Sequence, residues 1–379
     1  MGLTLTVSRL TKRFGEETAV TDLSFTVSPG ELFAFLGPSG AGKSTTLNLI
    51  AGLEKPDSGD ILADGQSILE VKSAQRDFAM VFESYALYPH FTVAENIAFP
   101  LRAPGRSEEY SESKINDMVL ETCKMLEIEE LLDRYPRELS GGQKQRVGLG
   151  RALARRPRLF LMDEPIAHLD AKLRHHMRGE LKKLQEKLGV TTLLATPDYH
   201  EVVAMADRAA ILSHGRIEQI GTPIELYNEP QNVIVANSIG DPPINLLDCV
   251  IEKKGDALSL VGDGFSITCG TALGEKITRQ GTTDGLILGV RPNDMVLEKD
   301  SRKGLIETEV YVFEPLGGEA VATLSLGAKR IKVVCPWEER LKIGDKVAVN
   351  FSAENIHLFD KETGKALAGQ ASQNPQRKE

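Results

Sequence analysis

Residues 37–44 read Gly37-Pro38-Ser39-Gly40-Ala41-Gly42-Lys43-Ser44 and match the pattern G-x-x-x-x-G-K-[ST]. A short apolar run, 31–36, comes directly before them, and Thr45 begins a helical pattern. This order predicts a loop between a buried strand and a helix, in which successive backbone N–H groups surround a phosphate. Glycines permit the close approach, Lys43 would neutralise phosphate charge, and Ser44 would offer its hydroxyl to Mg²⁺. An ordinary glycine-rich turn is the alternative, and the flanking strand and helix disfavour it.

A pair of carboxylates, Asp163 and Glu164, ends a second apolar run, 159–162, and Pro165 follows them. Buried parallel strands deliver such side chains to the carboxyl edge of an open sheet, where ligands bind. Asp163 would hold Mg²⁺, directly or through water, and Glu164 would polarise the water that attacks the γ-phosphate. The alternative is that Asp-Glu-Pro only ends a strand, and the phosphate loop upstream favours the catalytic interpretation.

The composition is that of a folded protein with more than one core. A chain of 379 residues exceeds one ordinary core, so we expect two domains. With 41% hydrophobic residues, 26% charged residues and a formal net charge of -9, the chain does not favour a nucleic-acid-binding surface over the whole protein. No run of about 18 apolar residues occurs, so no membrane-spanning helix is expected. The four cysteines lie far apart without paired spacing, and we interpret them as reduced thiols rather than disulfides or a zinc site: Cys123, Cys249, Cys269 and Cys335.

Strand-like and helix-like segments alternate as far as about Glu229. The apolar run 191–195 and the helical patterns 113–126 and 172–188 predict an α/β fold with a parallel sheet. After about Ile239, short strand-like runs between Gly/Asp turns predict a small all-β barrel. These runs are 257–261, 286–290, 330–334 and 346–349. We therefore expect one domain at 1–238 and a second at 239–379.

A third motif lies between the first two and reads Leu139-Ser140-Gly141-Gly142-Gln143. Ser-Gly-Gly alone is a common turn. In this order, with the phosphate loop and the carboxylate pair, it makes the chain resemble the ABC transporter ATPase family as far as about Ile220. The resemblance implies a P-loop NTPase fold with a helical subdomain at about 85–157, and hydrolysis of ATP with Mg²⁺. In that family two ATPase domains face each other head to tail, and each ATP lies between one phosphate loop and the other domain's signature.

The resemblance also assigns roles residue by residue. Phe14 would stack on adenine, although it could instead pack beneath the first strands. Ser140 and the amides of Gly141 and Gly142 would donate to the γ-phosphate of a partner's ATP, and Asp170 would cross the dimer interface. The nucleotide-binding candidates are Phe14, Gly37, Pro38, Ser39, Gly40, Ala41, Gly42, Lys43, Ser44, Thr45, Ser140, Gly141, Gly142, Gln143 and Asp170. The metal candidates are Ser44, Asp163 and Glu83, and the catalytic candidates are Glu164 and Glu83.

Two positions depart from the family pattern. Glu83 stands where the family has a glutamine that senses Mg²⁺ and the attacking water. Its carboxylate can bind Mg²⁺ but cannot donate a hydrogen bond when ionised, and a tolerated near-isostere is the alternative. Pro197 stands where the family has a histidine that contacts the γ-phosphate. Proline has neither a side-chain donor nor an N–H, so we expect slow hydrolysis at this chain's own loop, even if Pro197 also serves to start a helix.

The intact signature suggests how such a chain could still work. It could complete a competent site on the phosphate loop of a second, different ATPase, which gives a heterodimer with one active and one impaired site. A homodimer is the alternative. Residues 83–100, which include 84–90, resemble the segment that leads into the helical subdomain and receives helices of the membrane subunits, and part of this surface could instead be core. The candidates for that surface are Tyr85, Leu87, Tyr88 and His90.

Beyond Ile239 the resemblance narrows to importers of maltose, glycerol phosphate and related solutes. Residues 240–247, 289–294 and 356–360 look like parts of their C-terminal domain, which is built from oligonucleotide-binding-type (OB-type) barrels used for dimer contacts and regulation. The analogy does not imply nucleic-acid binding, because this half of the chain has few aromatic residues for stacking.

These features predict the ATP-hydrolysing motor subunit of an importer for a sugar or polyol. It would lie on the cytoplasmic face of the plasma membrane, bind two integral permease subunits, and act indirectly with an extracytoplasmic solute-binding protein. The alternatives are a non-transporting ABC-type regulatory or structural subunit, and an importer of an anion or polyamine. An ATPase that acts on nucleic acid is disfavoured, since no basic stripe is evident. The sequence does not identify the solute, which the other subunits select.

Overall fold

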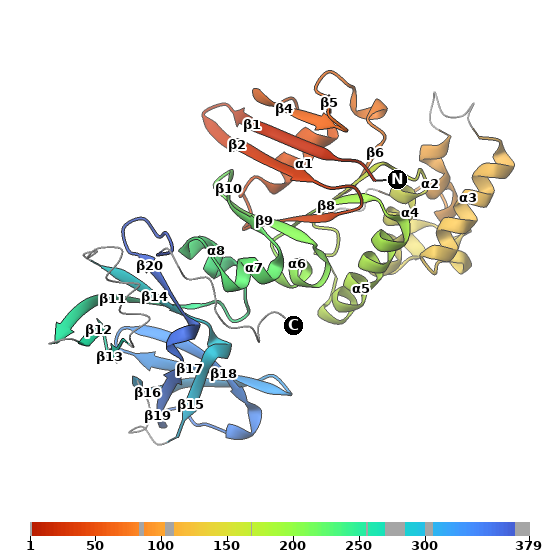
Figure 1. Cartoon of the computed structure of the whole chain (residues 1–379). Helices are drawn as coiled ribbons and strands as arrows, with labels where there is room; N and C mark the ends of the chain where they lie inside the picture. Colours follow the sequence, from red (N-terminus) through yellow and green to blue (C-terminus); the bar gives the residue numbers. More distant parts are fainter. Residues whose placement is uncertain are drawn as a thin grey trace. The chain divides into compact units, whose positions relative to one another are not determined.

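The structure is a computed structural model that describes residues 2–82, 87–102, 110–167, 169–254, 257–269, 285–299 and 306–367. Contacts divide the chain into two compact units, Met1–Pro223 and Ile224–Glu379, which Figure 1 colours from red to green and from green to blue. Each unit has its own hydrophobic core. Within the described ranges, no helix is both long enough and apolar enough to span a membrane.

A six-stranded sheet forms the centre of the first unit, in the order β10-β9-β3-β8-β7-β6. Parallel pairing joins β3 to β8 and β9, and β7 to β6 and β8, whereas β10 runs antiparallel to β9. Every residue of β3 and β8 is buried, as expected for strands covered on both faces. The predicted α/β fold is confirmed. The strands are β3 (Leu32–Leu36), β6 (Phe78–Val81), β7 (Leu159–Asp163), β8 (Thr191–Thr196), β9 (Arg208–Ser213) and β10 (Arg216–Gly221).

An antiparallel sheet, β2-β1-β4-β5, packs with the central sheet in the same core. The ring of Phe25 lies 5.4 Å from that of Phe33 and 5.2 Å from that of Phe35, which joins the two sheets through aromatic contacts. The strands are β1 (Leu5–Phe14), β2 (Glu17–Val27), β4 (Ser58–Ala63) and β5 (Gln66–Ser67).

Three helices, α2, α3 and α4, contact one another and lie between β6 and β7 in the chain. Figure 1 shows them grouped at one end of this unit. Side-chain caps start each of them: Thr92 for α2, Ser111 for α3 and Ser140 for α4. The helices of the unit are α1 (Lys43–Ala51), α2 (Val93–Ala98), α3 (Glu112–Met125), α4 (Gly141–Leu153), α5 (Ala171–Leu188) and α6 (Tyr199–Met205). Short 3₁₀ helices lie at Ser73–Gln75, Phe99–Leu101, Glu129–Leu131 and Pro136–Glu138.

The second unit holds two five-stranded antiparallel sheets around one apolar core, which confirms the predicted β-rich C-terminal domain. One sheet has the order β13-β12-β11-β14-β20 and the other β15-β19-β16-β17-β18. The first contains β11 (Asn245–Lys254), β12 (Ala257–Gly262), β13 (Phe265–Thr268), β14 (Leu286–Val290) and β20 (Ile356–Asp360). The second contains β15 (Met295–Glu298), β16 (Ile306–Pro315), β17 (Glu319–Leu326), β18 (Lys329–Pro336) and β19 (Lys346–Phe351). Helices α7 (Pro223–Asn228) and α8 (Val233–Ser238) precede the sheets, and 3₁₀ turns lie at Pro292–Asp294, Trp337–Glu339 and Ala353–Asn355.

Arg291 ties α7 and α8 to the strands of the second unit. Its side chain is 0% exposed, and its guanidinium lies 4.0 Å from the centre of the Tyr227 ring. The guanidinium donates to the carbonyls of Tyr227 at 2.7 Å, Ala236 at 2.8 Å and Ile239. Arg291 thus holds residues 227–239 to the strands of the second unit.

Replacing Arg291 with methionine should destabilise the second unit by about 3 kcal/mol, because three buried carbonyls would lose their donor. The single tryptophan, Trp337, lies in this unit and reports its unfolding by fluorescence during denaturant titration of the whole chain. Arg330→Met is the matched control, since exposed Arg330 also lies over an aromatic ring, that of Tyr311 at 4.3 Å. Equal midpoints for the two variants would contradict the role given to Arg291.

Candidate functional site

The loop between β3 and α1 depends on glycine at two positions. Gly42 caps α1 with a φ of 98°, and a Cβ there would lie 2.6 Å from the Ala19 carbonyl oxygen. A Cβ on Gly37 would lie 2.4 Å from the Leu212 carbonyl oxygen. No larger side chain fits without moving backbone, so the tight loop predicted for residues 37–45 is built on these contacts.

Lys43 is held beneath this loop. The side chain is 4% exposed, and its ammonium donates to the carbonyls of Gly37 at 2.9 Å and Pro38 at 3.0 Å. Its Nζ also lies 3.6 Å from Glu164 Oε1. A buried cation next to backbone N–H groups at a helix start is a suitable partner for phosphate oxygens. The sequence predicted the lysine but not its contact with Glu164.

Ser44 and Asp163 come together although they are 119 residues apart in the chain. The Ser44 hydroxyl donates to Asp163 Oδ1 at 3.0 Å, which brings the first turn of α1 to the end of β7. A hydroxyl and a carboxylate are the oxygen ligands that Mg²⁺ prefers. These two residues therefore fit the metal that the sequence predicted.

Glu164 has an unusual backbone. Its φ is 47°, in the left-handed region that non-glycine residues seldom adopt, and its N–H donates to the Ala195 carbonyl at 2.9 Å. Such conformations gather at functional sites, where the surrounding structure enforces them. The hydrogen bond fixes the start of the segment after β7 against β8, and no sequence pattern signals it.

Ser140 starts α4 through reciprocal hydrogen bonds with Gln143. A Cβ on Gly141 would meet no atom within 4 Å, so this first residue of the helix faces open space. Gln145, a buried residue that sequence reasoning missed, donates from Nε2 to the Pro165 carbonyl and links the signature helix to the Asp163–Glu164 segment. In the described part of the chain, no hydrogen bond or ion pair joins residues 140–143 to residues 37–45.

The other predicted site residues lie as follows. The ring of Phe14, at the end of β1, is 48% exposed and has the Lys12 ammonium 5.0 Å from its centre, so it is not buried beneath the strands. Asp170 caps α5 by accepting from the N–H of Leu173 at 2.9 Å. Glu83, and with it Tyr85 of the predicted docking surface, lie outside the described residues.

Strand register brings these segments to one edge of the sheet. Leu36 pairs with Thr196 and Asp163 pairs with Ala195, in parallel strands whose carboxyl ends therefore meet. Pro197 follows Thr196 directly and is exposed. The phosphate loop, the carboxylate pair and the Pro197 turn thus share the edge where ligands bind in open α/β sheets.

Comparison with known proteins agrees with this arrangement. The ABC transporter family profile matches residues 20–167, and the TOBE domain profile matches residues 288–359. The trehalose/maltose import ATP-binding protein MalK of Thermococcus litoralis is 44% identical over 375 residues, which cover 94% of this chain and 97% of that protein. The chain belongs to the ABC transporter family.

Other members of the ABC transporter family support the same assignment. The xylose/arabinose import ATP-binding protein XacK of Haloferax volcanii is 42% identical over 96% of this chain and 95% of its own length. A second such protein of that organism, XacJ, is also 42% identical, over 94% of each chain. A dimeric ATP-binding cassette, MJ0796, solved with ADP and Pi, matches with a TM-score of 0.52 and 32% identity over 57% of this chain and 98% of that one. As an ABC import ATP-binding protein with its phosphate loop complete, the chain is a transport-coupled ATPase that uses ATP and Mg²⁺.

Proposed function

We propose that the chain drives an importer for a sugar or polyol from the cytoplasmic face of the plasma membrane. The observation that carries this proposal is the edge that holds Lys43, the Ser44–Asp163 pair and Glu164, in a chain that matches sugar-import ATP-binding proteins over its β-rich end as well as its ATPase end. MalK and XacK match along nearly the whole length of this chain. The motor would bind two integral permease subunits and act indirectly with a solute-binding protein. Its ATPase domain would span 1–238, with a helical subdomain at about 85–157, and its regulatory domain 239–379.

The residues at the carboxyl edge of the central sheet have separate roles in binding and hydrolysing ATP. The backbone of residues 37–42 and the ammonium of Lys43 would bind the β- and γ-phosphates. Ser44 and Asp163 would hold Mg²⁺, with Glu83 as a further ligand, and the ion supplies neutralisation of phosphate charge. Glu164 would accept a proton from the attacking water. Its contact with Lys43 at 3.6 Å keeps that carboxylate beside the phosphate-binding ammonium.

ATP would be bound between two chains. Phe14 offers an exposed ring for adenine, while Ser140, Gly141 and Gln143 at the start of α4 would meet the ATP of the partner. The open space around Gly141 supports this role, because a γ-phosphate needs unobstructed access to the helix start. Asp170 would lie at the interface, and MJ0796, which aligns with the ATPase part of this chain, is a dimer.

The two chains of this pair would differ. Pro197 offers neither a side-chain donor nor an N–H to the γ-phosphate, so the site on this phosphate loop would hydrolyse ATP slowly. The partner would be a different ATPase whose own loop is completed by the signature of this chain. Haloferax volcanii has two different xylose/arabinose import ATP-binding proteins, XacK and XacJ, so two unlike ATP-binding chains with the same named solutes occur among these relatives.

An aromatic cluster at the start of the helical group would receive the permease. The ring of Tyr88 lies 4.5 Å from that of Phe99 and 5.4 Å from that of Phe91, and the Arg151 guanidinium lies 5.5 Å from its centre. Phe99 and His90 are exposed, whereas Leu87 and Tyr88 are half-buried. Exposed aromatic residues of this kind are typical of interfaces.

Reconstitution of the complete importer tests the function. We expect proteoliposomes that contain this chain, its permease subunits and its solute-binding protein to accumulate labelled sugar or polyol only with ATP and Mg²⁺. Lys43→Met should reduce uptake about 100-fold, because this loop must still bind ATP for the two chains to close, even where it hydrolyses ATP slowly, and the bound phosphates would lose their buried cation. A complex that accumulates only anions or polyamines from the same panel would contradict the proposed solute class. A chain that binds ATP but retains no permease would contradict the motor role.

A further inference from the structure

A buried carboxylate, Glu201, lies behind the Pro197 turn. Glu201 is on α6 and is 3% exposed. Its Oε2 atom has no hydrogen-bond partner among the described residues. An ionisable group this deeply buried is costly unless it is satisfied, so its presence needs an explanation beyond packing.

Thr196 connects Glu201 to the turn. The Thr196 hydroxyl hydrogen-bonds to the Glu201 carboxylate and accepts from the N–H of Asp198 at 3.0 Å, across Pro197. Asp198 in turn caps α6 by accepting from the N–H of His200 at 2.8 Å, and its carbonyl accepts from the N–H of Glu201 at 3.1 Å. The turn is therefore closed by a chain of hydrogen bonds, one of which, from Thr196, reaches the Glu201 side chain.

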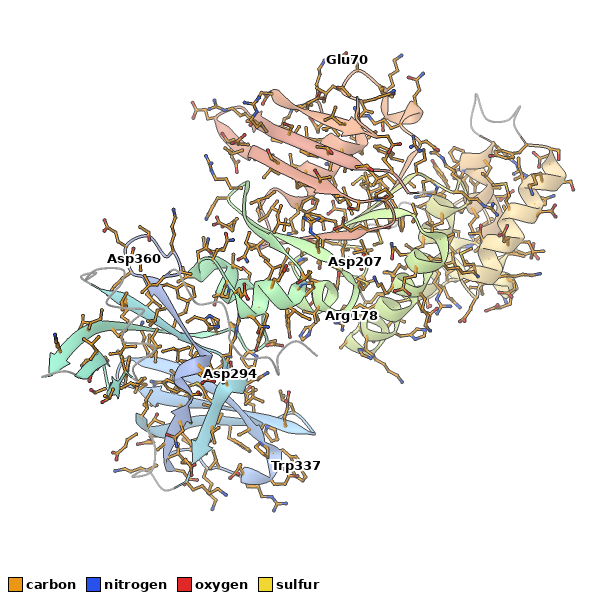
Figure 2. The ribbon with its side chains drawn as sticks, viewed as in Figure 1. Glu70, Arg178, Asp207, Asp294, Trp337 and Asp360 are labelled. Carbon is orange, nitrogen blue, oxygen red and sulfur yellow. The ribbon has the colours of Figure 1, made fainter. Side chains whose placement is uncertain are left out.

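The second wall around Glu201 is α5, which begins at Asp170. Arg174 and Arg178 of that helix act electrostatically on the carboxylate, and Figure 2 labels Arg178 on it. Arg174 Nη1 also lies 4.0 Å from Asp198 Oδ2. Helix α6 packs in addition against β3 and β8, and neither strand carries an acidic or basic residue. The charged groups that face Glu201 are thus Arg174, Arg178 and Asp198.

We propose that Glu201 is a positioning residue, which sets how firmly the Pro197 turn is held against α5 and so how that turn meets the γ-phosphate of ATP. The effect on the γ-phosphate rests on the proposed function, in which this chain binds ATP. The hold of Glu201 on the turn rests on the contacts in the structure. Because Pro197 has no side-chain donor, this position can act on ATP only through where its backbone lies. Glu201, which holds that backbone, would then determine how close the turn lies to the γ-phosphate.

The sign of the pH dependence follows from the burial. Burial raises the pKa of Glu201 from 4.5 to about 7; the Thr196 hydrogen bond lowers it, Asp198 raises it, and Arg178 and Arg174 lower it. Opening of the turn would hydrate the carboxylate and return its pKa toward the ordinary value. Protonation therefore favours the closed turn, and this stabilisation is full below about pH 4.5 and is lost as the pH rises through about 7.

Hydrogen–deuterium exchange of the full-length chain tests this directly. For peptides that cover residues 196–202, exchange divided by the chemical exchange rate should rise about 100-fold between about pH 4.5 and pH 7. Glu201→Gln keeps the shape of the side chain but cannot ionise, so its exchange should change less than about threefold over that range. Glu186→Gln, which removes a largely exposed carboxylate from α5, is the control and should follow the wild type.

A second variant and a nucleotide separate the possible outcomes. Thr196→Val removes the acceptor for Asp198 N–H and should raise exchange of the turn at every pH. The same pH dependence in Glu201→Gln and the wild type would overturn the role of Glu201. ATP with Mg²⁺ should protect these peptides in the wild type at about pH 8, whereas ADP should not. Protection by neither nucleotide, with the pH effect intact, would count against the proposed ATP site and not against the hold on the turn.

Discussion

Replacing Pro197 with histidine should raise ATP turnover by the isolated chain about 100-fold. The turn after β8 shares its edge with the phosphate loop and Glu164, and Pro197 is exposed there. A histidine would supply a donor to the charge that develops on the γ-phosphate, and one such donor is worth about 10²–10³ in rate. Steady-state phosphate release at saturating ATP and Mg²⁺ measures the effect.

Two further variants isolate the donor. Pro197→Ala restores the backbone N–H without adding a ring, so turnover should stay within about threefold of the wild type. Glu164→Gln in the Pro197→His chain should return turnover to background, since the proton acceptor is then lost. Rapid turnover by the unmodified chain, lost with Glu164→Gln, would refute the impaired site and with it the reason for an unlike partner.

The sequence predicts those parts of the site that consist of consecutive residues. Residues 37–44 carry the loop, the lysine and the hydroxyl within eight positions, and a buried strand precedes them. Asp163 and Glu164 are recognisable for the same reason, because the apolar run before them is a strand and its end is an edge. The local order of residues indicates the role of each one. Parallel strand pairing then brings the separate motifs to one edge of the sheet.

Contacts between distant residues could not be predicted this way. The Lys43–Glu164 ion pair, the positive φ of Glu164 and the hydrogen bond from Gln145 to the Pro165 carbonyl all depend on how α1, β7, β8 and α4 meet. Arg291 contacts carbonyls more than 50 residues earlier, so no local pattern indicates that α7 and α8 pack with the β-rich unit. The burial of Glu201 likewise arises from the packing of α6 on α5, which no local sequence pattern indicates.

In the complete importer, Gly141→Asp should abolish most ATP turnover, whereas Glu164→Gln should change it by less than about threefold. If the productive site lies on the partner's loop, this chain contributes α4 to it and not Glu164. A carboxylate at the start of α4 would lie about 4 Å from the γ-phosphate of that site, where like charges repel by about 4 kcal/mol at an effective dielectric constant of about 20. That penalty corresponds to about a 1000-fold loss of turnover.

The Gly141→Asp substitution should not change the fold, so a loss of ATP turnover would arise at the ATP site. A Cβ at Gly141 meets no atom within 4 Å, and aspartate is favourable in the first turn of a helix. Gly179→Asp is the matched control, because Gly179 on α5 is also exposed with open space around it. That variant should leave turnover unchanged within about twofold.

Comparing the loss of ATP turnover in Gly141→Asp and in Glu164→Gln distinguishes a homodimer from a pair of unlike subunits. In a homodimer each ATP needs Glu164 from one chain and the signature from the other, so both variants would stop turnover equally. In a pair of unlike subunits they act on different ATP molecules, and only the signature of this chain belongs to the faster site. Because Pro197 lies on the same edge as Glu164 and the phosphate loop, it would impair the ATP bound on this chain's own loop, whereas the signature would meet the ATP of the partner. Equal losses from Gly141→Asp and Glu164→Gln would therefore exclude the asymmetric pair.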